Sequence, residues 1–442
     1  MTRPIWIALV SLITIHGLWP AMTAADEVQA PPEELRLFEF HGYLRSGFGL
    51  NAKLGAQESF ILPGSGVRGG VPTRFRLGNE PETYGEAILV ANWLGAPSTD
   101  SVTFKTQILL SFFAFDHANQ NSPKIVSVNE AFAEAGGLFR AAPQVKIWAG
   151  QRYYRRLTND ILDFHYLDMS GMGGGVLDIP LGGGLLSVSF LGGSTGQDLT
   201  VDGFATKSSI DVRLADLPVA GKLTLWLAGS YVRGGTLPDG TGEVPSIPGS
   251  AIGLWHTVEG LLGGFQRLTV QAGRGALTDF QAHYKPTAFR LPADIIPGDR
   301  LVRDSWRLRV TEMLQIQPSP GFSLMGSAIY QVTDFAPEGG EGIEHWYSIG
   351  ARPIVHFNRY ASFAAEAGVE VIESELAADG VLAKISGAAQ VTAGGLFFSR
   401  PVLRAYVTLA TWSDALRGAI GGPAHRHDTR GLGMGLQLES WW

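Results

Sequence analysis

The sequence predicts an all-β protein, built as a transmembrane antiparallel β-barrel of roughly 16–18 strands. Short segments along most of the chain alternate apolar with polar residues, and no helical period is sustained. Only 17% of the 442 residues are charged, which is below the roughly 25% typical of soluble domains. The chain also holds 57 glycines, many of which lie with proline, aspartate and serine in turns between the segments.

The composition excludes several other classes of protein. Without cysteine there is no disulfide framework, thiolate metal site or cysteine nucleophile. A net charge of −7 without a basic cluster argues against nucleic-acid binding, and 45% hydrophobic residues exclude wholesale disorder. Beyond the N-terminus no apolar run approaches the ~18 residues that a membrane-spanning helix needs. The richest run, at 87–96, is interrupted by Asn92. A helical membrane protein is therefore not expected.

The N-terminus predicts export. Residues 1–25 resemble a secretory signal peptide, with Arg3 near the start, an apolar centre at 5–19 and small residues at the cleavage site. Residues 26–37 are acidic and interrupted by proline, and we expect them to form a short periplasmic lead. The barrel would then occupy residues 38–442.

The two ends of this region show the alternation most clearly. In 38–48, one face carries four apolar side chains, and the other carries Tyr43 and Arg45 with Glu39 and His41. Residues 432–442 repeat the pattern, with Trp442 on the apolar face, where it would suit an interfacial anchor. Similar segments lie at 84–93, 223–231, 267–273, 322–330, 363–373 and 402–410.

Two closed β architectures could hold such strands. A soluble sandwich array or propeller needs charged outer faces and usually a repeat of about 40–50 residues, and the sequence has neither. A transmembrane barrel needs apolar residues facing lipid in alternation with polar residues facing the lumen. The second architecture fits the pattern better.

The polar face of the strands carries aromatic residues, which suggests what the lumen binds. Alternation places five of them toward the lumen: Tyr43, Tyr84, Phe265, Phe398 and Trp441. A sugar ring presents apolar C–H faces that stack on aromatics and a rim of hydroxyls that need charged partners. Nearby charged residues could supply those partners: Arg45, Arg76, Glu86, Arg156 and Asp163. The alternative is that the aromatics pack under a loop that folds inward.

The segment 147–175 combines a strand with a region rich in charge and aromatics. His165 lies close to Asp163 and Asp168, but no third ligand stands at motif spacing, so neither a metal site nor a catalytic pair is predicted. The glycines at 171–175 are not a phosphate loop, because no Lys-Ser/Thr follows them. We interpret them as the exit of a long loop. No cofactor is expected.

Several segments resemble the maltoporin family, the trimeric sugar-specific porins of Gram-negative outer membranes. They are 40–47, 76–84, 147–154, 211–215, 399–401 and 439–442, in family order. The resemblance implies an 18-stranded barrel whose third extracellular loop folds inward, a homotrimer in outer-membrane lipid, and passive diffusion of maltose and maltodextrins with small ions.

The resemblance also assigns roles to residues. It places the aromatic slide of the family at Tyr43, Tyr84, Phe265, Phe398 and Trp441. Its polar track and constriction fall on Arg45, Arg76, Glu86, Arg156, Asp163, His165 and Asp168.

The chain departs from the family pattern at several positions. The stretch 116–129 lacks the tryptophan that a neighbouring subunit supplies in the family. A polar-track arginine falls on Ala133, a constriction tyrosine on His165, and Phe398 replaces a tryptophan. Enteric relatives have a disulfide where this chain has Ser59 and Pro81. The preferred solute therefore stays open among maltodextrins, another oligosaccharide such as sucrose, and general diffusion.

An enzymatic barrel is the remaining alternative from another class. Outer-membrane lipases and proteases need a Ser/His or acidic pair at the rim, and no G-x-S-x-G elbow occurs in this sequence. A structural or adhesion barrel would not need a track of aromatics. We therefore expect a channel rather than an enzyme.

Overall fold

A computed structural model describes residues 37–63, 74–94, 102–114, 124–193, 207–233, 235–236, 243–244, 246–282, 303–335, 342–376 and 378–442. The expected signal peptide and residues 26–36 of the lead lie outside the described residues, as do residues 115–123. Within the described part, no helix is long and apolar enough to cross a membrane.

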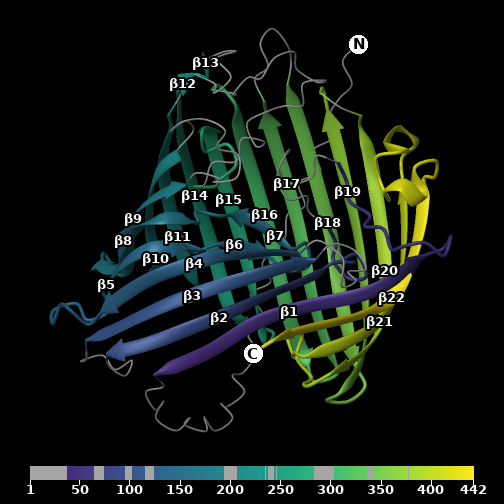
Figure 1. Cartoon of the computed structure of the whole chain (residues 1–442), viewed down its shortest axis with the longest axis horizontal. Coiled ribbons are helices and arrows are strands. Elements are labelled where there is room, and N and C mark those ends of the chain that lie inside the picture. Colours follow the sequence, from purple (N-terminus) through teal and green to yellow (C-terminus); the bar gives the residue numbers. More distant parts are fainter. Residues whose placement is uncertain are drawn as a thin grey trace. The chain divides into compact units, whose positions relative to one another are not determined.

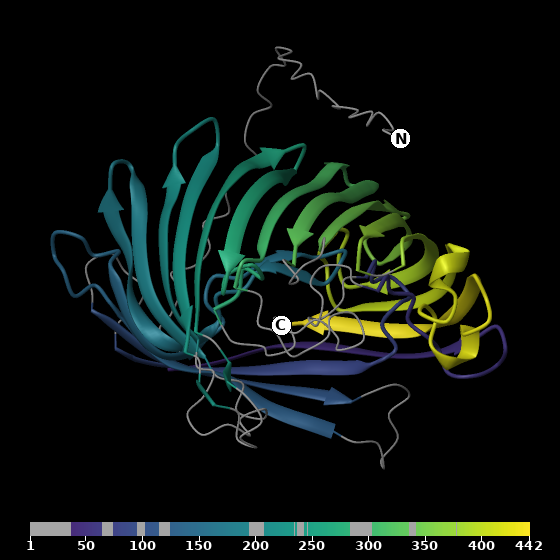
Figure 2. The ribbon, with the colours of Figure 1, turned by 90° about the horizontal axis from the view of Figure 1, so that it is seen from above.

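Eighteen strands form one antiparallel sheet that closes on itself (Figures 1 and 2). Each strand pairs with its neighbours along the chain, and β1 (Phe38–Asn51) also pairs with β22 (Arg430–Trp441), which closes the barrel. This confirms the predicted fold class. The other barrel strands are β2 (Thr83–Leu94), β3 (Thr103–Ala114), β4 (Lys124–Gly136), β5 (Lys146–Arg152), β8 (Gly171–Leu181), β9 (Gly184–Gly193), β10 (Lys207–Leu217), β11 (Lys222–Val232), β14 (Ile247–Leu261), β15 (Gly264–Gly275), β16 (Trp306–Ser319), β17 (Phe322–Asp334), β18 (Ile343–His356), β19 (Ala361–Ser374), β20 (Gly380–Thr392) and β21 (Val402–Trp412). Two short hairpins lie outside this sheet, β6 (Leu157–Asn159) with β7 (Phe164–Leu167) and β12 (Gly235–Thr236) with β13 (Glu243–Val244).

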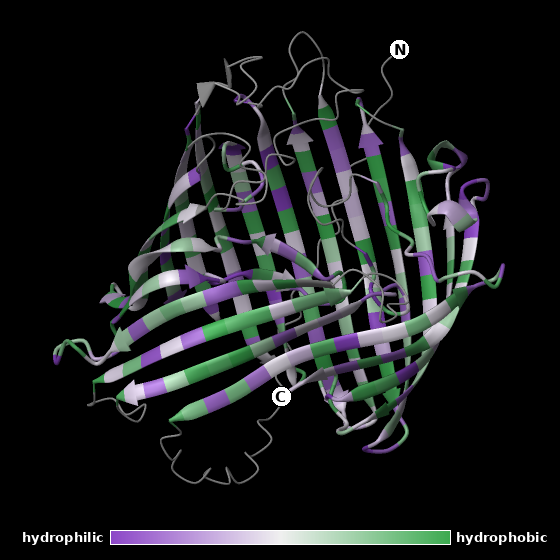
Figure 3. Ribbon diagram, in the orientation of Figure 1, coloured by the Kyte–Doolittle hydropathy of each residue, from purple (hydrophilic) through white to green (hydrophobic). Residues whose placement is uncertain are grey.

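Hydrophobic and hydrophilic residues alternate along the strands (Figure 3). The apolar side chains of this pattern face outward and the polar ones face inward. In β21, Leu403 and Val407 are 57% and 52% exposed, whereas Arg404 and Thr408 are 6% and 0% exposed. On the same outer face Trp442 packs against Phe40, with ring centroids 5.7 Å apart. A soluble protein buries its apolar face, so this inverted arrangement is typical of a barrel that faces lipid.

The glycines at 171–175 correct one expectation, because they begin strand β8 rather than ending a loop. A Cβ at Gly173 would lie 1.9 Å from the carbonyl oxygen of Phe190 on the paired strand β9. The close approach of the two backbones explains why this strand needs glycine. A run of glycines carries no apolar–polar alternation, so the sequence pattern could not reveal the strand.

The loop between β5 and β8 folds into the barrel, as the resemblance implied. Its hairpin β6–β7 reaches strands on the far side of the ring: Arg309 of β16 donates to the carbonyl oxygen of Tyr166 at 2.8 Å. Asn159 donates to the Ser327 hydroxyl of β17 at 2.5 Å. Figure 2 shows this part of the chain within the ring of strands.

A second inward segment, residues 74–82 between β1 and β2, packs against this loop. The backbone N–H of Arg76 donates to the carbonyl of Ile161 at 3.0 Å. The Phe75 ring lies flat against the wall, where a Cβ on Gly350 or Gly368 would come within 2.3 or 2.2 Å of it. The inward loop and this segment therefore support one another inside the barrel.

Asn79 holds residues 57–62 against this inner segment, close to Ser59 and Pro81, where the family resemblance places a disulfide of enteric relatives. Its side chain accepts from the backbone N–H of Phe60 at 2.7 Å and donates to the Phe60 carbonyl at 2.9 Å. The Ser59 hydroxyl donates to the Asn79 carbonyl at 3.1 Å. Hydrogen bonds thus join the two segments that the disulfide joins in those relatives.

We expect Asn79→Ala to lower the free energy of unfolding by about 2–3 kcal/mol, because it leaves buried backbone groups of Phe60 without partners. Urea unfolding of the vesicle-inserted protein, followed by tryptophan fluorescence, measures the change. The exposed Arg426→Ala is the control and should unfold with the wild type. A wild-type midpoint for Asn79→Ala would show that this clamp contributes nothing to stability.

Candidate functional site

Three of the five predicted slide aromatics form a continuous row on neighbouring strands. Tyr43 of β1 lies directly opposite Trp441 of β22, and their rings stack at 6.5 Å with an interplanar angle of 20°. Tyr84 of β2 is 6.0 Å from Tyr43, since its register partner is Arg45, two residues along β1. Strand register therefore sets the spacing of the row.

Phe113 of β3 extends this row by one ring. It is paired with Tyr84 across β2 and β3, and the two ring centroids lie 6.3 Å apart. Sequence reasoning did not include Phe113 in the slide, although its place on an alternating strand next to that of Tyr84 could have revealed it. We call Trp441, Tyr43, Tyr84 and Phe113 the aromatic row.

The other two predicted slide residues lie apart from the aromatic row. Phe398 belongs to the turn at 393–401 between β20 and β21, and its ring packs on Phe397 at 5.0 Å. Phe265 is the second residue of β15, and the guanidinium carbon of Arg267 lies 5.7 Å from the centroid of its ring. Both are partly buried against the large internal core. Among the ring contacts of the described residues, none connects either one to the row.

The tyrosine hydroxyls of the aromatic row are hydrogen-bonded to charged side chains. The Tyr43 hydroxyl donates to Glu439 at 3.1 Å and accepts from Arg76 at 2.8 Å. The Tyr84 hydroxyl donates to Glu86 at 2.5 Å. These contacts hold the two tyrosine rings by their hydroxyl edges, and the guanidinium carbon of Arg45 lies 5.4 Å from the centroid of the Tyr84 ring.

Glu439 is the centre of the charged cluster beside the row. Its carboxylate, 2% exposed, lies 3.0 Å from the guanidinium of Arg76, 2.7 Å from that of Arg400 and 2.8 Å from that of Arg404. Arg400 also covers the ring of Trp441, with its guanidinium carbon 4.3 Å from the centroid. One carboxylate from the last strand therefore joins an inward segment, a turn and a neighbouring strand.

Arg45 joins the elements of the constriction by ion pairs in the same way. It pairs with Glu80 at 2.9 Å, Glu82 at 2.6 Å and Asp163 at 2.9 Å. Glu80 and Glu82 belong to the inner segment 74–82, and Asp163 belongs to the inward loop. Arg45 and Arg76 are therefore committed to ion pairs that position the loops.

The charge of Asp163 resists protonation. Burial would raise the pKa of its carboxyl, but the guanidinium groups of Arg76, Arg45 and Arg74 outweigh burial and hold that pKa well below its ordinary range. A lowered folded-state pKa contributes stability that is complete above the unfolded value, about 3.9, and is lost only below it.

We therefore expect the constriction to keep its conductance as the pH falls from neutral to about 4, where an ordinary Asp is about half protonated. Asp163→Asn removes the charge at every pH and should raise single-channel conductance at pH 7 by releasing the inward loop from Arg45. Recordings in planar bilayers compare the two. If the conductance of the wild type at about pH 4 has moved about halfway to that of Asp163→Asn at pH 7, the lowered pKa is refuted.

The remaining predicted residues divide into two groups. The guanidinium carbon of Arg156 lies 3.4 Å from the centroid of the Tyr153 ring, and its Nη1 lies 3.4 Å from Nε2 of His165. Arg156 forms no ion pair within the described part of the chain. His165 also shares a 2.8 Å hydrogen bond with Thr158. Asp168 instead anchors the inward loop: its carboxylate accepts from Ser170, and its backbone bonds to residues 280 and 282.

The structure corrects the polar-track position that the resemblance assigned to Ala133. Ala133 is paired with Thr106 and Ala149 and lies between two inward-facing side chains, Phe132 and Glu134, which are 6% and 7% exposed. It therefore faces the outside of the wall. Sequence reasoning missed two cations of this wall that pair with Glu134, Arg152 at 2.8 Å and Lys105 at 3.4 Å.

The chain is similar to several known proteins. A family model described as LamB porin matches residues 38–442. Among solved structures, OccAB1 of Acinetobacter baumannii is similar, with 10% identity, a TM-score of 0.52, and coverage of 92% of this chain and 96% of that one. OmpF of Salmonella typhi has 12% identity and a TM-score of 0.45, covering 92% and 97%. At such identity the likeness to OccAB1 concerns the fold alone.

Proposed function

The chain belongs to the LamB porin family, and from this premise we propose that it is a sugar-specific porin for maltose and maltodextrins. As a porin of this family it is an outer-membrane channel rather than an enzyme. The observation that carries the proposal is the aromatic row, in which consecutive rings lie 6.5, 6.0 and 6.3 Å apart beside a cluster of buried charges.

In the proposed mechanism, a sugar chain moves along the row without energy coupling. The apolar C–H faces of its rings pack on the aromatic faces, and each ring can move to the next because the sites are close together. Selective conduction needs sites that attract the solute but release it quickly, so several weak contacts serve better than one strong one. Small ions would pass by the same route.

The polar contacts of the sugar are proposed to come from fewer residues than the resemblance implies. Arg45 and Arg76 already hold carboxylates in ion pairs, so they support the loops. Arg156 and Glu86 are the charged side chains that we propose as partners of sugar hydroxyls, one on the inward loop and one beside Tyr84. His165, next to Arg156, is proposed to line the same constriction.

Two related functions stay open: a porin for another oligosaccharide, such as sucrose, and a general diffusion porin. Swelling of liposomes that contain the purified protein separates them, because maltose and sucrose have the same mass. We expect maltose to enter faster than sucrose. Faster entry of sucrose would favour the other sugar, and equal rates for both would favour general diffusion.

Phe113 provides a sharper test, because its neighbour Phe112 points to the other side of the same strand and is 40% exposed on the outer face. Phe113 is the first ring of the aromatic row for a sugar that enters from the loop side. When maltodextrin is added from that side, we expect the ion current of Phe113→Ala to be blocked several-fold more slowly than that of the wild type. Phe112→Ala is the matched control and should leave the onset unchanged. Equal rates in both variants would remove Phe113 from the row.

The assembly and export of the chain are also proposals. We propose a homotrimer, in line with the family resemblance, and export by cleavage of residues 1–25. Cross-linking of detergent-extracted protein tests the trimer, and a product limited to monomer would overturn it. N-terminal sequencing of the mature protein tests the cleavage, which should leave Asp26 first.

A further inference from the structure

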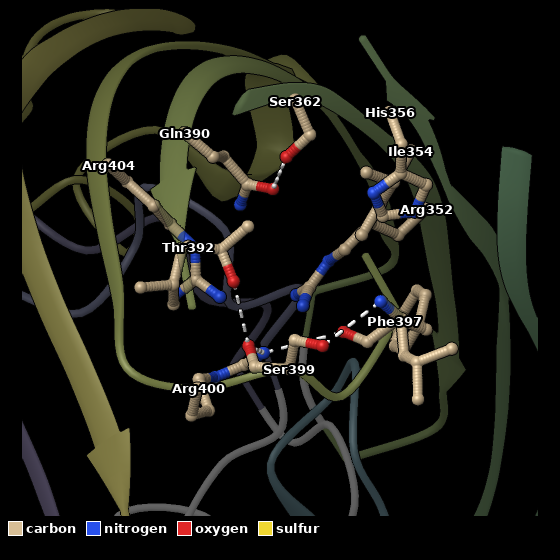
Figure 4. A pocket seen from close by; sticks show the side chains of 12 residues that line it. Arg352, Ile354, His356, Ser362, Gln390, Thr392, Phe397, Ser399, Arg400 and Arg404 are labelled. Atoms are coloured by element: carbon tan, nitrogen blue, oxygen red, sulfur yellow. Dashed lines mark hydrogen bonds between the residues drawn. The ribbon is translucent and has the colours of Figure 1, made fainter. Parts of the chain in front are cut away.

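A small pocket lies beneath the turn at 393–401, on the inner side of strands β18 to β21 (Figure 4). Its volume is about 10 Å³, which is room for one small group. The turn supplies Phe397, Ser399 and Arg400 to its lining, and the strands supply most of the rest.

The charges around this pocket are all of one sign. Arg352, Arg400 and Arg404 line it, and no carboxylate does. In Figure 4, their guanidinium groups converge on the same small space. Burial lowers the pKa of Arg400 to about 10, against the opposing pull of Glu439, so this group stays charged at neutral pH.

The neighbouring carboxylates do not balance these cations. Glu366 serves both Arg352, at 2.5 Å, and Lys384, at 2.9 Å. Glu439 serves Arg76, Arg400 and Arg404, and Arg76 has one further partner, Glu80. Glu80 also pairs with Arg45, which pairs in turn with Glu82 and Asp163, and Glu82 pairs with Arg74. Among the described residues, seven cations of this network therefore share five carboxylates. Surplus buried charge is costly unless a counter-charge accompanies it.

Two lining residues also carry buried nitrogen atoms without a partner in the described part of the chain. They are Nε of Arg404 and Nδ1 of His356. The other ring nitrogen of His356, Nε2, is hydrogen-bonded to the Ser323 hydroxyl at 2.9 Å. The Arg404 nitrogen can only donate, so an acceptor is missing beside it.

We propose that this pocket binds one small monovalent anion, of the size of chloride, between Arg352, Arg400 and Arg404. The anion supplies the missing acceptor, offsets the surplus charge, and ties the turn at 393–401 to the wall. This site adjoins the aromatic row through Arg400, which covers the ring of Trp441, and it does not depend on which sugar the channel carries.

The stability of the purified protein in chloride tests the proposal. Urea unfolding is measured at constant ionic strength while chloride replaces gluconate, an anion too large for the pocket. We expect the wild-type midpoint to rise and then saturate with chloride, because binding to the folded state stabilises it. Arg352→Gln should lose most of this rise. Arg417→Gln, at an exposed arginine that pairs with Asp414 outside the pocket, should keep it.

A second measurement needs no variant, because Arg352 also pairs with Glu366 and its replacement affects folding as well. Wild-type crystals grown in bromide should give an anomalous peak in the pocket within hydrogen-bond distance of the guanidinium groups. A midpoint indifferent to chloride, an equal rise in wild type and Arg352→Gln, or a pocket that holds only water in bromide would each overturn the proposal.

Discussion

Glu439→Gln is expected to destabilise the protein by about 3–5 kcal/mol, the range for breaking a buried ion pair by removing one partner. The amide would leave three buried guanidinium groups, those of Arg76, Arg400 and Arg404, without their shared negative charge. It would also lose the charged acceptor of the Tyr43 hydroxyl. Urea unfolding in lipid vesicles measures the effect.

The matched control is Glu259→Gln, which removes a carboxylate from an exposed pair with Lys222. Exposed pairs add little to stability, so this variant should unfold almost like the wild type. The double variant Glu439→Gln with Arg404→Gln should recover part of the loss, because it removes one of the stranded cations. If Glu439→Gln unfolds with its control, the cluster is not what joins the loops to the wall.

Tyr43→Ala is expected to produce the largest loss of sugar binding, because Tyr43 stands between Trp441 and Tyr84 in the aromatic row. Losing one ring face removes about 1–2 kcal/mol of apolar contact with a sugar ring. That energy corresponds to an affinity lower by about 5- to 30-fold. Titration of the blocked ion current with maltodextrin measures the change.

Tyr43→Phe separates the ring from its hydroxyl, which is bound to Glu439 and Arg76. If the ring face binds the sugar, Tyr43→Phe should keep most of the affinity that Tyr43→Ala loses. An equal loss in both variants would mean that the charged cluster, rather than the stacking surface, determines binding.

The barrel could be predicted from the sequence because its cause is local. Alternation within one strand decides which side chains face inward, and this correctly placed Tyr43, Tyr84 and Trp441 together. Prediction from alternation fails where residues have no side chains to alternate, and where a residue lies outside a strand. The glycines at 171–175 have no side chains to alternate, and Phe398 lies in a turn whose position depends on the packing of other elements.

The charged part of the site could be predicted only as a set of residue types. Arg76 and Glu439 are separated by most of the chain, and only the inward fold of segment 74–82 brings them within 3.0 Å. Sequence reasoning therefore assigned Arg45 and Arg76 to sugar hydroxyls, whereas the structure commits both to ion pairs. The same limit explains Ala133, where the strand register that places it outward cannot be read from its neighbours in sequence.

The central claim is that the aromatic row binds a linear sugar inside the channel. Ion current through the protein in a planar bilayer, recorded while maltodextrin is added, tests it most directly. We expect the current to fall with sugar concentration to a saturating block, and the block to weaken in Tyr43→Ala and Trp441→Ala. A current that stays unchanged at every concentration of maltodextrin and of sucrose would contradict the claim and leave a general diffusion pore.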